Sequence, residues 1–359
     1  MKKLTVLLIL ALLLGVLSGC MLPPLQPGEP VLTKPAEPVP TASAEPAPTT
    51  AAPVSASTAQ PEDSSAPAPA GDEGVHPMLF HVTGEGGAEA WLFGTIHVGD
   101  ERINTALEKV LPYLDGCDAL AVEFDIVAYE KDYAAQMKAM SGFVLADGST
   151  VDQHMPKELF DRASALLSEA KLMPSMMKAY NLSMWAQLVE QAALMTRSKL
   201  SMEIGMDRAL IGHCYDKNIE VRDVESAELQ YDLLASFPDE LNLLLIEETL
   251  DNLDEYGEGI DKLYSAWLDG DYDGLMAVMS EEDDEETEEL TEAQQAMLED
   301  YNDKMLTQRN LGMRDKAVQW LEAGDKVFFA VGAAHLLDED GLAALLRAAG
   351  YTVEQVEYK

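Results

Sequence analysis

Two stretches near opposite ends of the sequence decide the fold: AEAWLFGTIHV at residues 88–98 and DKVFFAVGAAH at residues 325–335. Each begins with an apolar run typical of a buried strand and ends in the spacing G-x-x-H, which is Gly94 to His97 in the first and Gly332 to His335 in the second. A helix-like segment and a second strand-like run follow each block, ALAVE at 119–123 and TVEQVE at 352–357. The sequence therefore predicts two similar strand, G-x-x-H, helix, strand halves.

The remaining pattern predicts an α/β fold whose central mixed sheet is built from these two pseudo-symmetric halves. Residues 78–84 form another strand, joined to 88–98 as a hairpin through Glu85-Gly86-Gly87. A large helical insertion occupies about 128–310, interrupted by one alternating strand at 219–224. Apolar periodicity predicts helices at 103–114, 129–140, 156–172, 176–195, 207–217, 227–237, 239–268, 291–309, 311–323 and 342–349.

The G-x-x-H spacing is common enough to arise by chance, so its placement carries the argument. Both histidines follow an apolar strand and precede a helix, where their side chains would lie beyond the carboxyl edge of a sheet. Glu123 ends a buried strand, where an isolated carboxylate is unfavourable unless it is paired or bound to a cation. Two imidazoles and one carboxylate predict a divalent-metal site with open positions for water. The alternative is two ordinary loop histidines and a strand-end acid that faces solvent.

The N-terminus is typical of an exported lipoprotein. Lys2 and Lys3 precede an apolar run from Leu4 to Leu17, and the small residues before Cys20 complete a signal peptide at 1–19. The apolar run is too short to cross about 30 Å of hydrocarbon as a helix. We therefore expect a lipid on Cys20, which would attach the chain to a membrane. The alternative is an ordinary secretory signal in which Cys20 is incidental.

Residues 20–76 read as the lipidated cysteine followed by a disordered linker, and 77–359 as the folded domain. The linker contains 13 of the chain's 18 prolines and almost no large apolar residue, so it has little to bury. At ~3.1 Å per residue, some 50 extended residues span about 150 Å. The export signal predicts an extracytoplasmic, membrane-anchored protein at the cell surface, and the reach of the linker, enough to pass into or through a cell wall, suits a Gram-positive envelope.

Net charge limits the classes of binding partner, and cysteine content limits the possible zinc sites and disulfides. A formal net charge of −40 disfavours nucleic acid and anionic lipid surfaces. The acidic run at 281–289 is expected to be solvated, because it lacks the glycine-centred spacing of an EF-hand. Apart from Cys20 the chain contains only Cys117 and Cys214, in no zinc-binding spacing, and the sequence leaves open whether they form a disulfide.

The same blocks resemble the TraB/GumN family in order and spacing. The resemblance covers about Met78 to the C-terminus and rests on WLFGTIHVGD at 91–100, AVEFD at 121–125, EIGMDRAL at 203–210, RDVESAELQ at 222–230, RN at 309–310 and FFAVGAAHLLDEDGLAALLRAAGYTVEQV at 328–356. It implies the fold of erythromycin esterase-like and ChaN-like proteins and kinship with Tiki metalloproteases. The acidic run and the long linker lie outside the family pattern.

The resemblance also implies roles for individual residues. His97, His335 and Glu123 would bind a catalytic divalent ion, expected to be Mn²⁺ or Co²⁺ with Zn²⁺ as a further candidate, while Arg309 and Asn310 would orient substrate or stabilise an oxyanion. Gly94, Gly332, Asp207, Glu225 and Gln230 would support the site structurally. The implied activity is hydrolysis of peptides or proteins outside the cell. Two alternatives remain: a non-catalytic lipoprotein that sequesters a peptide or small ligand, and a hydrolase of non-peptide esters.

Overall fold

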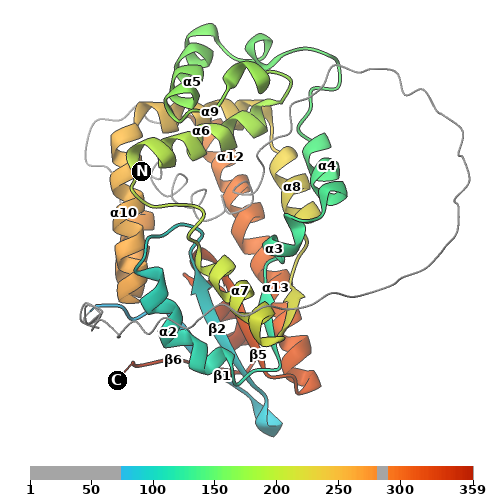
Figure 1. Cartoon of the computed structure of the whole chain (residues 1–359), viewed down its shortest axis with the longest axis vertical. Helices are drawn as coiled ribbons and strands as arrows, with labels where there is room; N and C mark the ends of the chain where they lie inside the picture. The colour runs from blue at the N-terminus through green and yellow to red at the C-terminus, as the bar shows by residue number, and fades with distance from the viewer. Residues whose placement is uncertain (1–73, 281–289, 359) are drawn as a thin grey trace, which may run out of the picture. The chain divides into compact units, whose positions relative to one another are not determined.

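The computed structural model describes residues 74–280 and 290–358 (Figure 1). The signal segment, Cys20, the linker up to residue 73 and the acidic run at 281–289 lie outside the described residues.

One six-stranded mixed sheet forms the base of the fold, as predicted. Its strands, in the order β4-β3-β5-β2-β1-β6, are β1 (Leu79–Thr83), β2 (Glu89–Thr95), β3 (Ala119–Val122), β4 (Glu220–Asp223), β5 (Val327–Gly332) and β6 (Thr352–Gln355). β5 pairs in parallel with β2 and β3, and β3 pairs in parallel with β4. β1 is antiparallel to both β2 and β6. The carboxyl ends of β2, β3, β4 and β5 therefore lie at one edge of the sheet.

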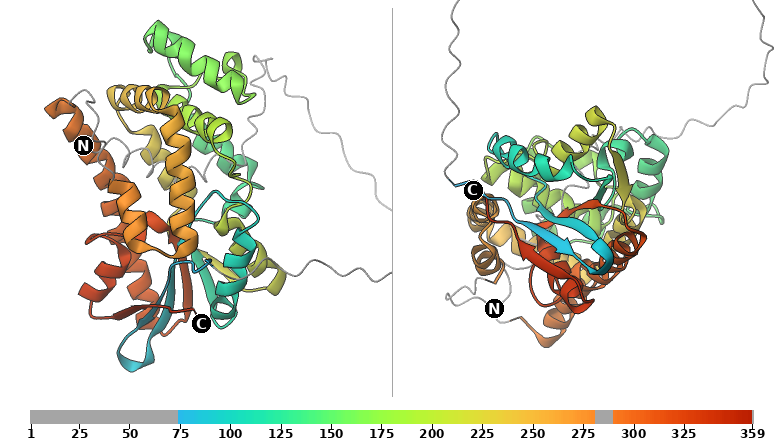
Figure 2. Two further views of the ribbon diagram at one scale, coloured as in Figure 1. Left: turned by 90° about the vertical axis from the view of Figure 1, so that its left-hand side faces the viewer. Right: turned by 90° about the horizontal axis from the view of Figure 1, so that it is seen from below.

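The two predicted halves run outward from the centre of this sheet. The first passes from β2 through α2 (Ile103–Leu114) to β3, and the second passes from β5 through α14 (Leu342–Ala348) to β6. Because the crossovers travel in opposite directions, right-handed connections place their helices on opposite faces. The sheet indeed lies between a layer containing α2 and one containing α13 (Gln308–Ala323), against which α14 packs (Figure 2).

The β1–β2 hairpin turns through a short 3-10 segment, Glu85–Gly87. Gly86 and Gly87 have φ of 73° and 88°, a region that disfavours residues with a Cβ. The turn sets the register in which Leu79 pairs with Phe93. The predicted hairpin is confirmed.

The insertion is mostly a layer of helices above the carboxyl edge of the sheet, but its α7 (Met206–Lys217) packs against β3 and β4 beside α2 (Figure 1). Its members are α3 (Ile126–Tyr129), α4 (Tyr133–Ser141), α5 (Lys157–Glu169), α6 (Leu182–Arg197), α7 (Met206–Lys217), α8 (Ala227–Ala235), α9 (Asp239–Asp251), α10 (Leu253–Asp269), α11 (Tyr272–Ser280) and α12 (Glu292–Asn302). α6 packs against α5, α9 and α10 and is buried along most of its length. In α10, Trp267 donates its indole N–H to the carbonyl of Gly94 at 2.8 Å, which ties the helical layer to β2.

Four predicted helix boundaries are wrong. The helix predicted at 176–195 begins only at Leu182, and the one predicted at 129–140 begins only at Tyr133. The segment 239–268 is not one helix but two, because Asn252 leaves helical geometry (φ −116°, ψ 35°) and bonds its side-chain amide to the carbonyl of Glu248. Conversely, the predicted interruption at Asn310 is absent. α12 continues through a π-helical turn, Asp303–Thr307, directly into α13.

Cys117 and Cys214 are free thiols, and burial raises the pKa of each to about 12. Across the described part of the chain, no helix combines the length and apolar character needed to cross a bilayer.

Candidate functional site

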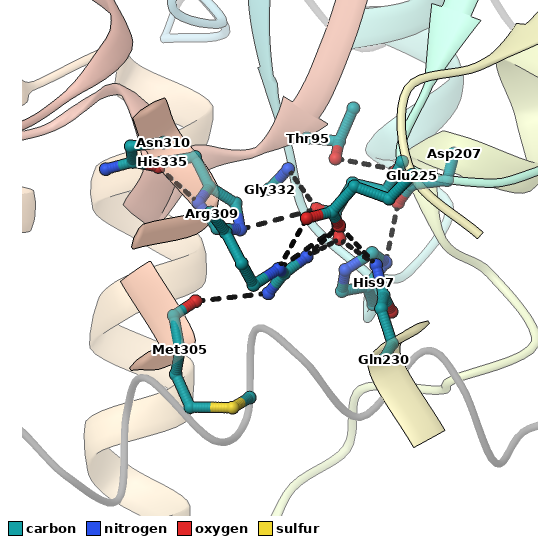
Figure 3. A network of polar contacts seen from close by, with 11 residues as sticks. Thr95, His97, Asp207, Glu225, Gln230, Met305, Arg309, Asn310, Gly332 and His335 are labelled. Atoms are coloured by element: carbon teal, nitrogen blue, oxygen red, sulfur yellow. Dashed lines mark hydrogen bonds and ion pairs between the residues drawn. The ribbon is translucent and has the colours of Figure 1, made fainter. Parts of the chain in front are cut away.

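The residues singled out from the sequence meet at the carboxyl edge of the sheet (Figure 3). His97 follows β2, Glu123 follows β3, and His335 lies in the turn after β5. The remaining members are Asp207 in α7, Glu225 in the segment after β4, Gln230 in α8, and Arg309 and Asn310 in α13.

Gly332 is at the centre of this arrangement. A methyl group placed on Gly332 would lie 3.2 Å from Glu123 Oε1, 3.7 Å from His335 Cδ2 and 3.9 Å from His97 Nε2. The backbone N–H of Gly332 donates to Glu123 Oε1 at 2.9 Å. The two histidines and the carboxylate therefore surround one small space, which a side chain at position 332 would fill.

Glu123 is ionised in this buried site. Burial by itself raises the pKa of Glu123, but the charge of Arg309, with contributions from His335, His97 and the N–H of Gly332, lowers that pKa well below the ordinary carboxyl value. Arg309 donates from Nη2 to Glu123 Oε2 at 2.6 Å, and Gln230 donates to the same oxygen at 2.8 Å. Oε1 is left facing the two histidines.

Arg309 is held between two carboxylates. Its Nε donates to Glu225 Oε1 at 3.0 Å, its Nη2 to Glu225 Oε2 at 2.7 Å, and its Nη1 to the carbonyl of Met305 at 3.1 Å. Burial lowers the pKa of Arg309, yet the charge of Glu123 and the bond to Glu225 outweigh that effect and raise the pKa. Gln230 completes the network by donating to Glu225 Oε2 at 2.9 Å.

His335 is a neutral imidazole with a defined tautomer. The amide nitrogen of Asn310 donates to the carbonyl of Asp340, so its Oδ1 faces His335 Nδ1, 2.6 Å away. Nδ1 is therefore the protonated nitrogen, and Nε2 carries the lone pair. Burial and the charge of Arg309 lower the pKa of His335 to about 3. Within the described residues, Nε2 has no hydrogen-bond partner and lies 3.8 Å from Glu123 Oε1.

His97 is oriented by Asp207, with Nδ1 2.8 Å from Oδ2 of that carboxylate. The other oxygen of Asp207 accepts from the hydroxyl of Thr95 at 2.7 Å. Burial lowers the pKa of His97, but Asp207 and then Glu123 raise it, and the net shift is upward. α7 can approach because Gly205 lies against the His97 backbone, where a Cβ would be 2.9 Å from the carbonyl oxygen of His97.

The donor types at this site are ones that a divalent ion accepts. Two Nε2 atoms and Glu123 Oε1 are ligands that Mn²⁺, Co²⁺ and Zn²⁺ accept. The other nitrogen of His335 is hydrogen-bonded to Asn310, and that of His97 lies 2.8 Å from the Asp207 carboxylate. Two ligands about 2.1 Å from one ion lie roughly 3 to 4 Å apart, a range that includes the His335 to Glu123 separation of 3.8 Å. In residues 74–280 and 290–358, no group of three or more His, Cys, Asp or Glu side chains is arranged so that it could hold a metal ion without rearrangement.

Charge also favours such an ion. The site brings three carboxylates, Glu123, Asp207 and Glu225, around one guanidinium, that of Arg309. With both imidazoles neutral, as metal ligands must be, this group carries a net charge of −2, which is unfavourable away from water. A divalent cation would neutralise it.

Comparison with known proteins agrees with this site. The model of the TraB/PrgY/gumN family matches residues 78–355, a range that includes every residue of the candidate site. The chain belongs to the TraB/PrgY/gumN family. Its relatives include "Uncharacterized protein YbaP" of Shigella flexneri and of Escherichia coli (strain K12), each 26% identical over 266 residues, 74% of this chain and 90% of the relative. No solved structure matches the chain.

In this TraB/PrgY/gumN chain, nine of the ten residues predicted for the site meet in one network. The tenth, Gly94, is outside the network. A Cβ on Gly94 would lie 3.1 Å from Ala333 Cα. Because glycine has no side chain, β2 can lie against the turn that carries His335. Sequence reasoning missed Thr95, although it stands inside the first G-x-x-H block. It also missed Met305 and Asp340, which act through backbone carbonyls and leave no signal in the sequence.

Proposed function

We propose that this TraB/PrgY/gumN protein is a metal-dependent hydrolase of peptides, tethered outside the cell through Cys20. The observation that supports it most is the convergence of His97 Nε2, the His335 ring and Glu123 Oε1 around the space at Gly332. Tethering rests on the lipoprotein-like signal and on the proline-rich linker.

His97, His335 and Glu123 would hold the ion, with Mn²⁺ or Co²⁺ expected and Zn²⁺ as a further candidate. When bound, the ion would supply an acidified water as nucleophile and would polarise the scissile carbonyl. Asp207 keeps the Nε2 of His97 turned toward the site, and Asn310 does the same for His335. Arg309 keeps Glu123 ionised and fixed, so that one carboxylate oxygen remains available.

Arg309 and Asn310 are both engaged within the protein. Arg309 bonds to Glu123, Glu225 and the carbonyl of Met305, and Asn310 uses both ends of its amide on His335 and Asp340. We therefore assign to Arg309 the role of positioning Glu123, and to Asn310 the role of positioning His335. Direct contact of either residue with substrate stays a prediction.

The test is hydrolysis by the full-length protein. Purified chain is incubated with a peptide library and Mn²⁺, Co²⁺ or Zn²⁺, and products are followed by mass spectrometry. We expect products that disappear with chelator and in His97→Ala, while His213→Ala, a histidine that pairs with Asp115 away from the site, retains activity. Peptide cleavage that persists in chelator would refute the proposal.

The same experiment separates the two alternatives. A sequestering lipoprotein would retain intact peptides, and its binding would survive chelation. A hydrolase of non-peptide esters would leave the peptide library intact and cleave a parallel panel of carboxylic esters in a metal-dependent way.

A further inference from the structure

Thr95 is the last residue of β2 and is fully buried, yet it carries a hydroxyl. Burying a hydroxyl is unfavourable unless it is hydrogen-bonded, and valine has nearly the same shape without that penalty. The Thr95 hydroxyl donates to Asp207 Oδ1 at 2.7 Å, although the two residues are 112 positions apart in the sequence (Figure 3). Thr249 in α9 is equally buried, but its hydroxyl donates to a carbonyl of its own helix, that of Leu245, at 2.9 Å. The hydroxyl of Thr95 is therefore directed at a carboxylate of the candidate site.

The Asp207 carboxylate lies between Thr95 and His97. Oδ1 accepts the Thr95 hydroxyl, and Oδ2 lies 2.8 Å from His97 Nδ1. The torsion that turns an aspartate carboxylate has only a weak preference of its own, so hydrogen bonds set the direction of its oxygens. Threonine, in contrast, is β-branched and has a restricted χ1 angle. The stiff strand residue therefore determines how the carboxylate faces His97.

The backbone of Thr95 is fixed beside the centre of the site. Thr95 pairs with Gly332 in the parallel register of β2 and β5. The N–H of Gly332 donates to Glu123 Oε1 at 2.9 Å. This one pair of strand residues therefore orients two of the three candidate ligands, Glu123 directly and His97 through Asp207. A site supported by strands is held more exactly than a site supported by loops.

We propose that Thr95 is a positioning residue for the candidate metal ligand His97. Its hydroxyl holds the Asp207 carboxylate, and that carboxylate keeps Nε2 of His97 turned toward the space at Gly332. In this role Thr95 acts through Asp207 and touches neither the ion nor the substrate. The inference rests on the proposed metal-dependent hydrolysis, because it assigns the residue that orders one ligand of the same site.

Titration of the full-length protein with Mn²⁺ tests this role without any hydrolysis. Thr95→Val removes the hydroxyl and keeps the shape, so Mn²⁺ affinity should fall about 10-fold, as when a ligand loses an outer hydrogen-bond partner. Thr95→Ser keeps the hydroxyl and should restore most of the affinity. Thr249→Val is the matched control, because it removes an equally buried hydroxyl outside the site and should leave Mn²⁺ affinity unchanged. Equal affinity losses in Thr95→Val and Thr249→Val, or in Thr95→Val and Thr95→Ser, would overturn the role.

A double-mutant cycle shows whether Thr95 acts through Asp207. In an Asp207→Ala background, Thr95→Val should cause no further loss of Mn²⁺ affinity, because the carboxylate that the hydroxyl holds is gone. Losses that simply add would overturn the proposed path. If Thr95→Val does not fold, Thr95→Ala takes its place, since it differs from Thr95→Ser only by the hydroxyl oxygen and should show the same loss relative to it.

Crystal structures of the metal-free variants separate this role from the proposed function. In Thr95→Val, the separation of Asp207 Oδ2 from His97 Nδ1 should exceed hydrogen-bond reach, about 3.5 Å. Thr95→Ser should keep it near the 2.8 Å of the wild type. An unchanged separation in Thr95→Val overturns the role, whether or not the protein binds Mn²⁺. Absence of Mn²⁺ binding or of hydrolysis in the wild type, with the displacement present in Thr95→Val, would instead refute only the proposed function.

Discussion

Arg309 and Glu123 are 186 residues apart in the sequence and form a buried ion pair at 2.6 Å. The pair fixes the tip of β3 against the start of α13. The second oxygen of Glu123 accepts the N–H of Gly332 at the end of β5. One carboxylate thereby joins three segments, and its orientation sets the direction in which the candidate metal site opens.

Replacing Arg309 with methionine should destabilise the fold. The change leaves Glu123 and Glu225 buried without their cation, and breaking such a pair costs about 3–5 kcal/mol. Urea unfolding at pH 7 measures the loss. Arg314→Met is the matched control, because Arg314 pairs with the exposed Asp315 and should change stability by less than about 1 kcal/mol. Equal losses in the two variants would contradict the importance of the buried pair.

The same ion pair predicts a pH dependence of stability. The folded state lowers the pKa of Glu123 below its ordinary value of 4.5. Its stabilising contribution is therefore complete above pH 4.5 and is lost as pH falls through the folded pKa. The free energy of unfolding of the wild type should fall below that pH, and the fall should be smaller in Arg309→Met. Parallel pH profiles would show that Arg309 does not control this carboxyl.

Asp207→Asn should weaken metal binding through His97. The substitution removes the charge that orients Nδ1 of His97, and loss of such a partner typically reduces metal affinity 10- to 100-fold. Titration calorimetry with Mn²⁺ measures the affinity. NMR should also show a lower pKa for His97, because Asp207 raises it in the wild type. Asp216→Asn, on an exposed position of the same helix, is the control and should bind Mn²⁺ normally.

Gly332→Ala should abolish Mn²⁺ binding while the protein stays folded. The added methyl would lie 3.2 Å from Glu123 Oε1 and would fill the space between the ligands. Gly332 has a φ of −48°, so alanine causes no backbone strain there. Gly312→Ala is the control, since its Cβ would meet nothing within 4 Å. Normal Mn²⁺ affinity in Gly332→Ala would place the ion elsewhere.

Glu190→Gln should stabilise the metal-free protein at high pH, because Glu190 is buried in α6 and neither of its carboxyl oxygens has a hydrogen-bond partner among the residues that the structure describes. The folded state raises the pKa of Glu190 above 4.5, so its contribution is fully present below pH 4.5 and is lost as pH rises through the folded pKa. The variant and the wild type should be similar near pH 4. At pH 8 the variant should be more stable by about 1–3 kcal/mol. Glu203→Gln, at an exposed position, should show no such divergence. A stability difference that does not change with pH would contradict the burial of an unpaired carboxyl.

Local patterns were enough to predict the sheet and the outline of the site. The apolar runs before Gly94 and Gly332 are strands, and in parallel strands the residues that follow the carboxyl ends meet at one edge. From the sequence alone, this rule predicts that His97, Glu123 and His335 lie together. Helix ends were harder to predict, because Asn252 breaks a continuous apolar pattern and the π-helical turn at Asp303–Thr307 bridges an expected interruption.

The sequence by itself determined the fold class, the family pattern and the residues that meet at the sheet edge, because strand periodicity and glycine spacing are local properties. Only the tertiary structure decided the partners: Arg309 pairs with carboxylates 84 and 186 residues away, and Asn310 selects the tautomer of His335. It alone also revealed Glu190, which in the sequence is an ordinary charged residue of a helix. It is buried in α6, against which α5, α9 and α10 pack, and contacts between distant segments leave no periodic signal.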